Sequence, residues 1–104
     1  MTDLRQDVLD AIRGICRTAP AVRRAWLFGS RARGDAGARA DIDLAIEAPG
    51  IGDREWTDLW TALKESLPTL LRIDVVRWEQ ASERLRQNIL AEGVVLHDAT
   101  RSAA

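Results

Sequence analysis

Apolar positions recur along the chain with two periods, one typical of helices and one typical of strands. Helical spacing predicts helices over residues 3–18, 56–67 and 81–92. Short apolar or alternating runs predict strands over residues 25–28, 41–47, 71–77 and 94–97. Because helices and strands alternate along the sequence, we expect an α/β fold of the α+β type, in which helices pack against a sheet.

Several residues mark the expected ends of the helices. Thr2 or Asp3 is expected to cap the start of the first helix, and Pro20 closes that segment. Pro68 is expected to end the second helix, and Gly93 is the expected C-cap of the third.

The predicted strand over residues 41–47 has two different faces. Its large apolar side chains fall on one face, which carries Ile42, Leu44 and Ile46. The opposite face carries Asp41, Asp43 and Ala45. The strand is therefore expected to bury one side and to present two carboxylates on the other.

Length and composition narrow the range of partners. A chain of 104 residues, 46% of them apolar, is the size of one domain, which we place at residues 1–99 with a flexible tail at residues 100–104. Fifteen basic and sixteen acidic residues give a net charge of −1, which argues against nucleic acid as a partner. The single cysteine, Cys16, is expected to be a small core residue and excludes an internal disulfide. The N-terminus has no apolar run typical of a signal peptide or membrane span, so we expect a cytoplasmic protein without a membrane partner.

A Gly-Ser pair ends the predicted strand over residues 25–28. Gly29 has no Cβ, which permits a tight turn and lets a phosphate approach the backbone. Free backbone N–H groups at the start of a helical turn and the Ser30 hydroxyl add hydrogen-bond donors at the same point. Arg31 and Arg33 follow within one turn and could add positive charge. The pair therefore predicts a phosphate site, and the alternative is a turn that only ends the strand.

Asp41 and Asp43 stand two residues apart in a predicted strand, so their side chains leave from the same face. Two carboxylates at this spacing repel each other unless a proton or a cation lies between them. Mg²⁺ is the natural cation, because it takes one or two protein carboxylates and leaves its other positions to water and phosphate. The alternative is that both acids lie on a solvated strand face.

Asp74 interrupts an otherwise apolar strand. A lone ionised carboxylate in the middle of a strand is costly unless it is paired or binds a metal. If the two acidic strands are neighbours, Asp74 could complete a two-metal site with Asp41 and Asp43, a kind of site that promotes phosphoryl transfer. The alternatives are an ion pair with Arg72 or Arg77, or a position at the edge of the sheet.

Together, these residues resemble the signature of a known superfamily. Gly29-Ser30, ten further residues and Asp41-x-Asp43 match the Gly-Ser-x10-Asp-x-Asp pattern of the DNA polymerase β-like nucleotidyltransferases. Over roughly residues 4–98, the chain is similar to the minimal (MNT) branch of that superfamily. The resemblance implies the nucleotidyltransferase fold, with a small mixed β-sheet.

The resemblance also implies a role for each residue of the pattern. Gly29 and Ser30 would hold the phosphates of ATP, and Asp41 and Asp43 would bind two Mg²⁺ ions. Asp74 would help to bind the catalytic metal and to activate the acceptor hydroxyl.

In function, the chain resembles the antitoxins of HEPN/MNT pairs, which adenylylate a tyrosine of their HEPN ribonuclease partner. The sequence after Asp74 has room for one helix, one strand and a tail, so the acceptor is expected to be met on an exposed surface or to be another chain. Ala40 stands where many relatives have Ser, which removes a hydroxyl near the site but no metal ligand. Two alternatives stay open: neutralisation by complex formation alone, and transfer to a small molecule such as an aminoglycoside.

Four tryptophans bear on the alternative of complex formation, because Trp is favoured at protein interfaces. Trp26 is predicted to lie in a buried strand, and helical spacing places Trp56 and Trp60 in the core. Trp78, at the end of a strand, is predicted to be the exposed ring. His97 is expected at a surface or sheet edge, without a second His or Cys nearby to share a zinc ion.

Overall fold

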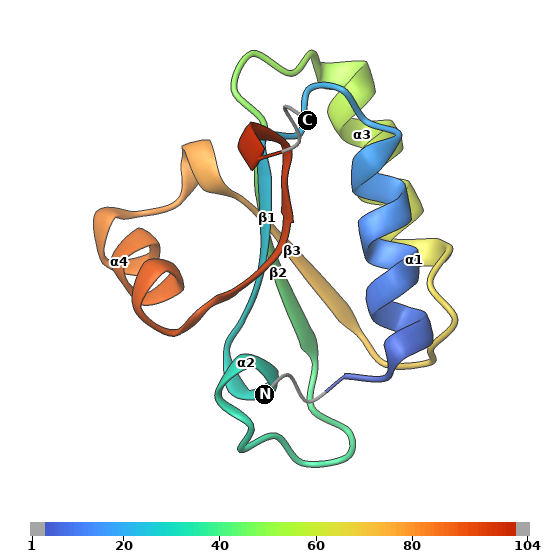
Figure 1. The fold of residues 1–104 in the computed structure, drawn as a ribbon, viewed down its shortest axis with the longest axis vertical. Coiled ribbons are helices and arrows are strands. Elements are labelled where there is room, and N and C mark those ends of the chain that lie inside the picture. Colours follow the sequence, from blue (N-terminus) through green and yellow to red (C-terminus); the bar gives the residue numbers. More distant parts are fainter. Residues whose placement is uncertain (1–3, 102–104) are drawn as a thin grey trace.

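The computed structural model describes residues 4–101 and confirms the alternation of helices and strands (Figure 1). The helices are α1 (Gln6–Arg17), α2 (Ser30–Arg33), α3 (Asp53–Glu65) and α4 (Glu83–Glu92). The strands are β1 (Arg24–Phe28), β2 (Ile42–Glu47), β3 (Ile73–Arg77) and β4 (Val94–Asp98). Short 3₁₀ turns follow the last two strands, namely η1 (Trp78–Gln80) and η2 (Ala99–Arg101).

The predicted ends of the helices are confirmed in part. α1 begins at Gln6 and has Arg5 as its N-cap, without a capping hydrogen bond from that side chain. Thr2 and Asp3, the expected capping residues, lie outside the described residues. Gly93 is the C-cap of α4, as predicted.

The four strands form one mixed sheet in the order β3-β2-β1-β4. β1 runs antiparallel to β2 and β4, whereas β2 and β3 run parallel. The two acidic strands are therefore neighbours, as a shared metal site requires. Because of these directions, the end of β1 and the starts of β2 and β3 lie at the same end of the sheet.

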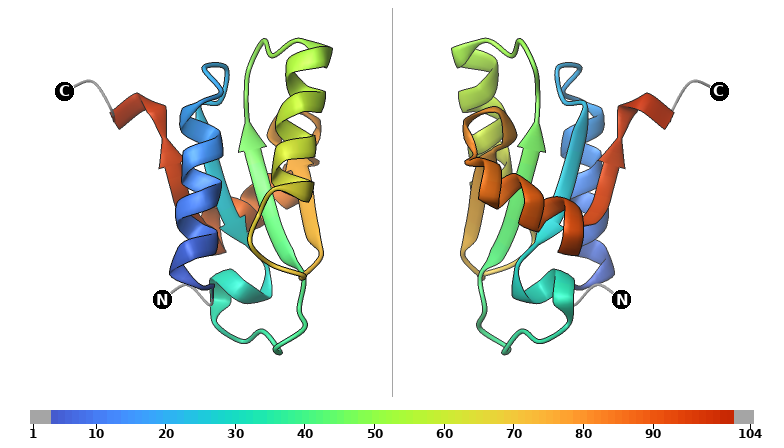
Figure 2. Two further views of the ribbon diagram at one scale, coloured as in Figure 1. Left: turned by 90° about the vertical axis from the view of Figure 1, so that its right-hand side faces the viewer. Right: turned by 90° about the vertical axis from the view of Figure 1, so that its left-hand side faces the viewer.

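Helices cover the two faces of the sheet unequally. α1 and α3 lie on one face and α4 lies on the other (Figures 1 and 2). The face toward α1 and α3 holds the main core, whose fully buried side chains include Ile12, Leu27, Ile42, Leu44, Ile46 and Leu63. The opposite face, here called the α4 face, has a smaller buried cluster of Trp26, Ala45 and Ile89. The alternation along β2 thus predicted its core side correctly, but α4 also buries Ala45 on the other side.

Two tryptophan predictions are wrong. Trp78 is not an exposed ring, because it stacks on Trp26 with 4.8 Å between ring centroids and 26° between the ring planes. Trp60 is 40% exposed, because α3 buries only a narrow stripe that includes Leu59, and Trp60 lies beside that stripe. Trp26 is buried, as predicted, and Trp56 packs at the margin of the main core.

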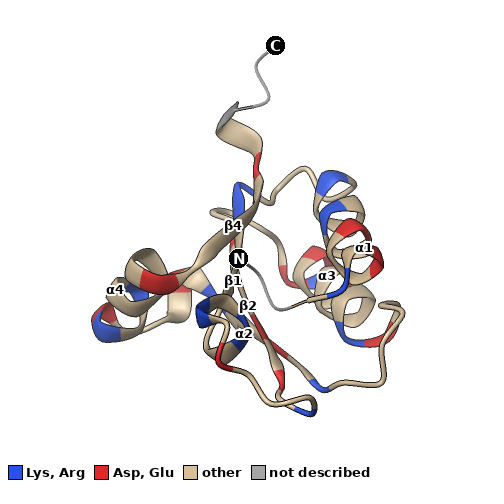
Figure 3. Ribbon diagram, turned by 60° about the horizontal axis from the view of Figure 1, so that its bottom comes forward, with Lys and Arg blue, Asp and Glu red and all other residues tan. Residues whose placement is uncertain are grey.

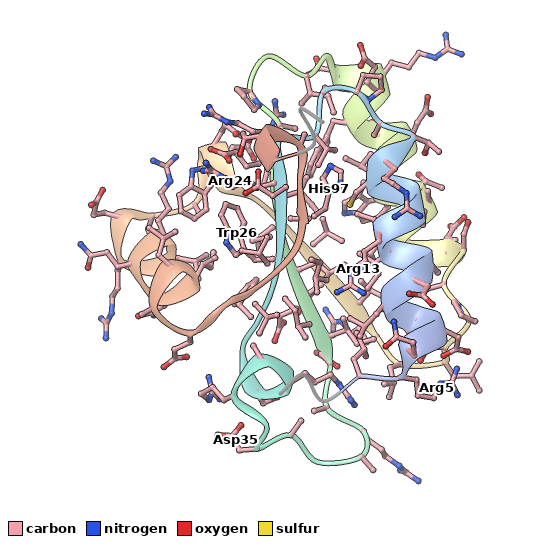
Figure 4. The ribbon with its side chains drawn as sticks, in the orientation of Figure 1. Arg5, Arg13, Arg24, Trp26, Asp35 and His97 are labelled. Atoms are coloured by element: carbon pink, nitrogen blue, oxygen red, sulfur yellow. The ribbon has the colours of Figure 1, made fainter. Side chains whose placement is uncertain are left out.

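Ion pairs join the strands at the end of the α4 face where β1 begins. Arg24 lies 3.5 Å from Glu47 (Nη1 to Oε1) and 3.7 Å from Asp98 (Nε to Oδ2), and Figure 4 shows Arg24 in this position. The Thr100 N–H donates to Asp98 Oδ1 at 2.9 Å, so the expected tail starts with a turn held against β4. Residues 102–104 lie outside the described residues.

β4 forms one outer edge of the sheet. Arg13 of α1 donates a hydrogen bond from Nε to the carbonyl oxygen of Leu96 on this strand, at 3.1 Å. His97 is half-buried on the same outer strand, which matches its predicted edge position. Across residues 4–101, no helix has the length and apolar character needed to cross a bilayer.

Candidate active site

The sheet topology brings the predicted site residues to one end of the α4 face. Phe28 pairs with Asp43 across the antiparallel β1–β2 ladder, and the Gly-Ser turn follows β1 directly. Asp43 in turn pairs with Asp74 across the parallel β2–β3 ladder. We call this region the acidic end, defined by Gly29, Ser30, Asp41, Asp43 and Asp74. Figure 3 turns this end toward the viewer, with the acidic positions of β2 next to the basic positions of α2.

Gly29 links the turn to the acids. Its backbone has φ 73° and ψ −156°, a conformation that residues other than glycine rarely adopt. A Cβ at this position would collide with the carboxylate of Asp43. The carbonyl oxygen of Gly29 accepts hydrogen bonds from the N–H groups of Ala32 and Arg33, each at 3.1 Å, which opens α2 at Ser30. The turn therefore needs glycine for its conformation and for its close approach to Asp43.

Asp43 lies in an environment of excess negative charge. Burial raises the pKa of Asp43, and the carboxylates of Asp74 and Asp41 raise it further, against the opposing effect of Arg33. A divalent cation relieves such repulsion, and carboxylate oxygens are ligands that Mg²⁺ prefers. The donor set of the acidic end therefore fits Mg²⁺.

Asp74 is less enclosed than the metal hypothesis suggests. Its side chain is 46% exposed on the outer strand β3, and its Oδ1 lies 3.9 Å from Nη2 of Arg72. The alternatives of an ion pair with Arg72 and of an edge position are thus both observed, whereas Arg77 pairs with Glu79 instead. Within residues 4–101, no three His, Cys, Asp or Glu side chains gather closely enough to hold a metal ion. Metal binding by all three acids stays a prediction.

The two arginines of α2 differ sharply in their surroundings. Arg33 is exposed and lies 3.1 Å from Asp35 and 3.2 Å from Glu92, two contacts that raise its pKa. Arg31 is only 6% exposed and donates hydrogen bonds to main-chain carbonyl groups of the following loop. Arg31 and Arg33 stand two residues apart, so they leave the helical turn on different sides.

Cys16 and His97 lie away from the acidic end. Both line a cavity of about 370 Å³ between the end of α1 and β4. Burial raises the pKa of the Cys16 thiol to about 12, against a smaller opposing effect of Arg17. The thiol is therefore uncharged at neutral pH, in agreement with its predicted role as a small core residue.

Comparison with known families identifies the family and its fold. The family described as "Polymerase beta, Nucleotidyltransferase" matches residues 10–102. The chain therefore belongs to this nucleotidyltransferase family, and its mixed sheet with flanking helices is the nucleotidyltransferase fold. No match is found among curated proteins.

Solved structures connect the chain with the minimal nucleotidyltransferases. A toxin–antitoxin structure with AMP-PNP is 25% identical, with a TM-score of 0.72 over 89% of this chain and 75% of that chain. A candidate minimal nucleotidyltransferase is 30% identical, with a TM-score of 0.67 over 83% of this chain and 86% of that chain. A tri-AMPylated HEPN toxin in complex with its MNT antitoxin, from Shewanella oneidensis, is 24% identical, with a TM-score of 0.68 over 94% of this chain and 76% of that chain. The second confirms the resemblance to minimal nucleotidyltransferases, and the first and third share the fold of this chain.

Proposed function

We propose that this chain is a Mg²⁺-dependent adenylyltransferase that transfers AMP from ATP to a tyrosine hydroxyl of a HEPN-type toxin, for which it is the antitoxin. Membership of the nucleotidyltransferase family supports the class of reaction. The similar structure with AMP-PNP supports an adenine nucleotide as donor, and the similar structure with an AMPylated toxin supports a protein as acceptor. Because ATP is the proposed donor, the proposed place of action is the cytoplasm.

One observation carries this proposal. The Gly29 backbone lies directly against the Asp43 carboxylate, and Asp74 faces Asp43 from the next strand. A phosphate bound at the Gly-Ser turn would therefore adjoin carboxylates that attract a divalent cation. In this proposal, phosphate groups are bound by Gly29, Ser30 and Arg33, and two Mg²⁺ ions are held by Asp41, Asp43 and Asp74.

The proposed reaction is an in-line displacement at phosphorus. The acceptor oxygen forms a bond to the α-phosphorus of ATP, and the bond from that phosphorus to the oxygen bridging to the β-phosphate breaks. Pyrophosphate leaves with the bonding electrons, and Asp74 accepts the proton of the acceptor hydroxyl. Bound Mg²⁺ supplies positive charge that stabilises the phosphate oxygens in the transition state. The exposure of Asp74 on the outer strand β3 leaves it accessible to a hydroxyl on the surface of another protein.

The test is transfer of label from ATP to the partner. The purified chain is incubated with α-labelled ATP and MgCl₂, with and without the HEPN-type product of the adjacent gene. We expect label on the partner, and we expect Asp43→Ala to reduce labelling by at least about 100-fold, as for removal of other groups that stabilise transition-state charge. Asp58→Ala is the matched control, because Asp58 is an exposed acid on α3, outside the acidic end.

The other outcomes distinguish the alternatives. If Asp43→Ala neutralises the toxin as well as the unchanged chain does, the antitoxin acts by forming a complex, and catalysis is not needed. If label is found only on an added small molecule such as an aminoglycoside, the acceptor is not a protein.

A further inference from the structure

Arg31 is a buried charged residue whose side chain is turned into the protein. Among residues 4–100, Arg31 is the one charged or polar residue that is buried, with 6% exposure. An arginine stays charged when buried, so its guanidinium must be compensated by hydrogen-bond acceptors. The identity of those acceptors shows what the side chain does.

Two of these acceptors belong to the loop that joins α2 to β2. Arg31 Nε donates to the carbonyl oxygen of Ala40 at 3.0 Å, and Arg31 Nη2 donates to that of Ala38 at 3.3 Å. The planar fork of a guanidinium suits two carbonyl groups two residues apart, and a lysine ammonium lacks this geometry. Within this loop, the Ala40 N–H also donates to the Gly37 carbonyl oxygen at 3.0 Å, which forms a turn. Arg31 thus ties the last part of the loop to α2.

The tied segment leads directly into the acidic end. The Ala40 carbonyl belongs to the peptide group that continues into Asp41, so fixing it fixes the point from which the Asp41 side chain departs. The next residue, Ile42, is held from the other side, because its N–H donates to the Arg72 carbonyl oxygen at 2.9 Å. Asp41 therefore lies between two residues whose main-chain groups are hydrogen-bonded, Ala40 to Arg31 and Ile42 to Arg72.

We infer that Arg31 is a positioning residue, which fixes the loop before Asp41 and thereby sets the Asp41 carboxylate for cation binding. This inference rests on the proposed function only where it concerns the cation. It replaces the phosphate-binding role for Arg31 and leaves Arg33 as the exposed arginine of α2. Placement of this kind matters because a displacement of about 1 Å at a reacting centre can lower a rate by about 100-fold.

The first experiment compares Arg31→Lys with Arg39→Lys. Arg39 lies in the same loop and is exposed, so it controls for the loss of a guanidinium there. For Arg31→Lys, we expect kcat to fall at least about tenfold and the half-saturating Mg²⁺ concentration to rise, with little change in KM for ATP. For Arg39→Lys, we expect all three values to stay as in the unchanged chain. A raised KM for ATP alone would identify Arg31 as a phosphate ligand and overturn the inference.

The second experiment uses the unchanged chain, so it does not depend on a variant that folds. Hydrogen exchange of arginine Nε–H groups is followed by NMR, without nucleotide or metal. We expect the Arg31 Nε–H to exchange at least about tenfold more slowly than that of the exposed Arg39, because it is buried and hydrogen-bonded. Equal exchange would overturn the inference. If the unchanged chain transfers no AMP to any acceptor, the proposed function fails, whereas this measurement still decides whether Arg31 holds the loop.

Discussion

The two ends of the α4 face each hold acidic side chains, but the charges around these side chains differ. At the end where β1 begins, here called the ion-pair end, Arg24 lies between Glu47 and Asp98, whose side chains are 14% and 13% exposed. At the acidic end, Asp43 and Asp74 face each other across β2 and β3, and their mutual repulsion contributes to the raised pKa of Asp43. The same face thus contains carboxylates that lie beside an arginine and carboxylates that repel each other.

The two ends therefore differ in the role that their charges have in the protein. α4 covers the middle of the face, where Trp26 and Ala45 are buried, and Arg24 forms an ion pair with Glu47 at the ion-pair end. At the acidic end, Asp41, Asp43 and Asp74 lie near one another although their negative charges repel. This repulsion lowers the stability of the fold. Such a cost is typical of sites that are completed by a ligand of the opposite charge.

The largest change in stability is expected when the ion pairs at the ion-pair end are removed. Arg24→Met keeps the apolar stem but leaves Glu47 and Asp98 largely buried without their cation, so we expect a loss of about 2 kcal/mol in the free energy of unfolding. Urea unfolding measures this loss. Arg23→Met is the control, because Arg23 is an exposed neighbour in the sequence. If both variants lose equally, the ion pairs do not stabilise the fold.

A smaller change in stability is expected when Mg²⁺ binds at the acidic end. Mg²⁺ that binds only the folded chain stabilises it, by about 1.4 kcal/mol when its free concentration is ten times the dissociation constant. We expect the melting temperature to rise with MgCl₂ relative to EDTA, with KCl at equal ionic strength as the control for screening. Asp43→Asn should remove this rise. An equal rise in Asp43→Asn would show that the cation binds elsewhere.

The smallest change in stability is expected when the charge of Asp43 is removed, which relieves the repulsion at the acidic end. Because the pKa of Asp43 is raised in the folded chain, the folded state holds more protons than the unfolded state between the ordinary and the raised pKa, and stability falls as pH rises through this window. In EDTA at neutral pH, Asp43→Asn should therefore stabilise the fold, by roughly 0.5 kcal/mol after allowance for screening by water. The gain should shrink as the pH falls toward the ordinary aspartate pKa of about 3.9. Urea unfolding in EDTA at several pH values measures it, and a loss of stability at neutral pH would contradict the repulsion.

The local features of this site could be predicted from the sequence, and its long-range contacts could not. Asp43 and Leu44 lie on opposite faces of β2 because alternation is a property of any strand. That Asp43 faces Asp74 depends on which strands become neighbours, which the sequence left as a condition. Gly29 indicated a tight turn, but its contact with Asp43 arises only when β1 and β2 pair.

Burial of single side chains was harder to predict. Arg31 and Arg33 are the same residue type in the same short helix, and the acceptors that bury Arg31 come from the path of the following loop, which the sequence does not show. Trp78 follows a strand, where a ring is often exposed, yet it meets Trp26 because η1 folds back over the sheet. Such contacts depend on segments distant in the sequence.

The hydrogen bond from Arg13 to Leu96 has a consequence for self-association. An outer strand offers unpaired main-chain groups to which a strand of another molecule can add, which is a common route to aggregation. In this chain, Arg13 occupies the Leu96 carbonyl oxygen and brings a charged side chain to β4. The same arginine that anchors α1 thus makes extension of the sheet into a neighbouring molecule less favourable.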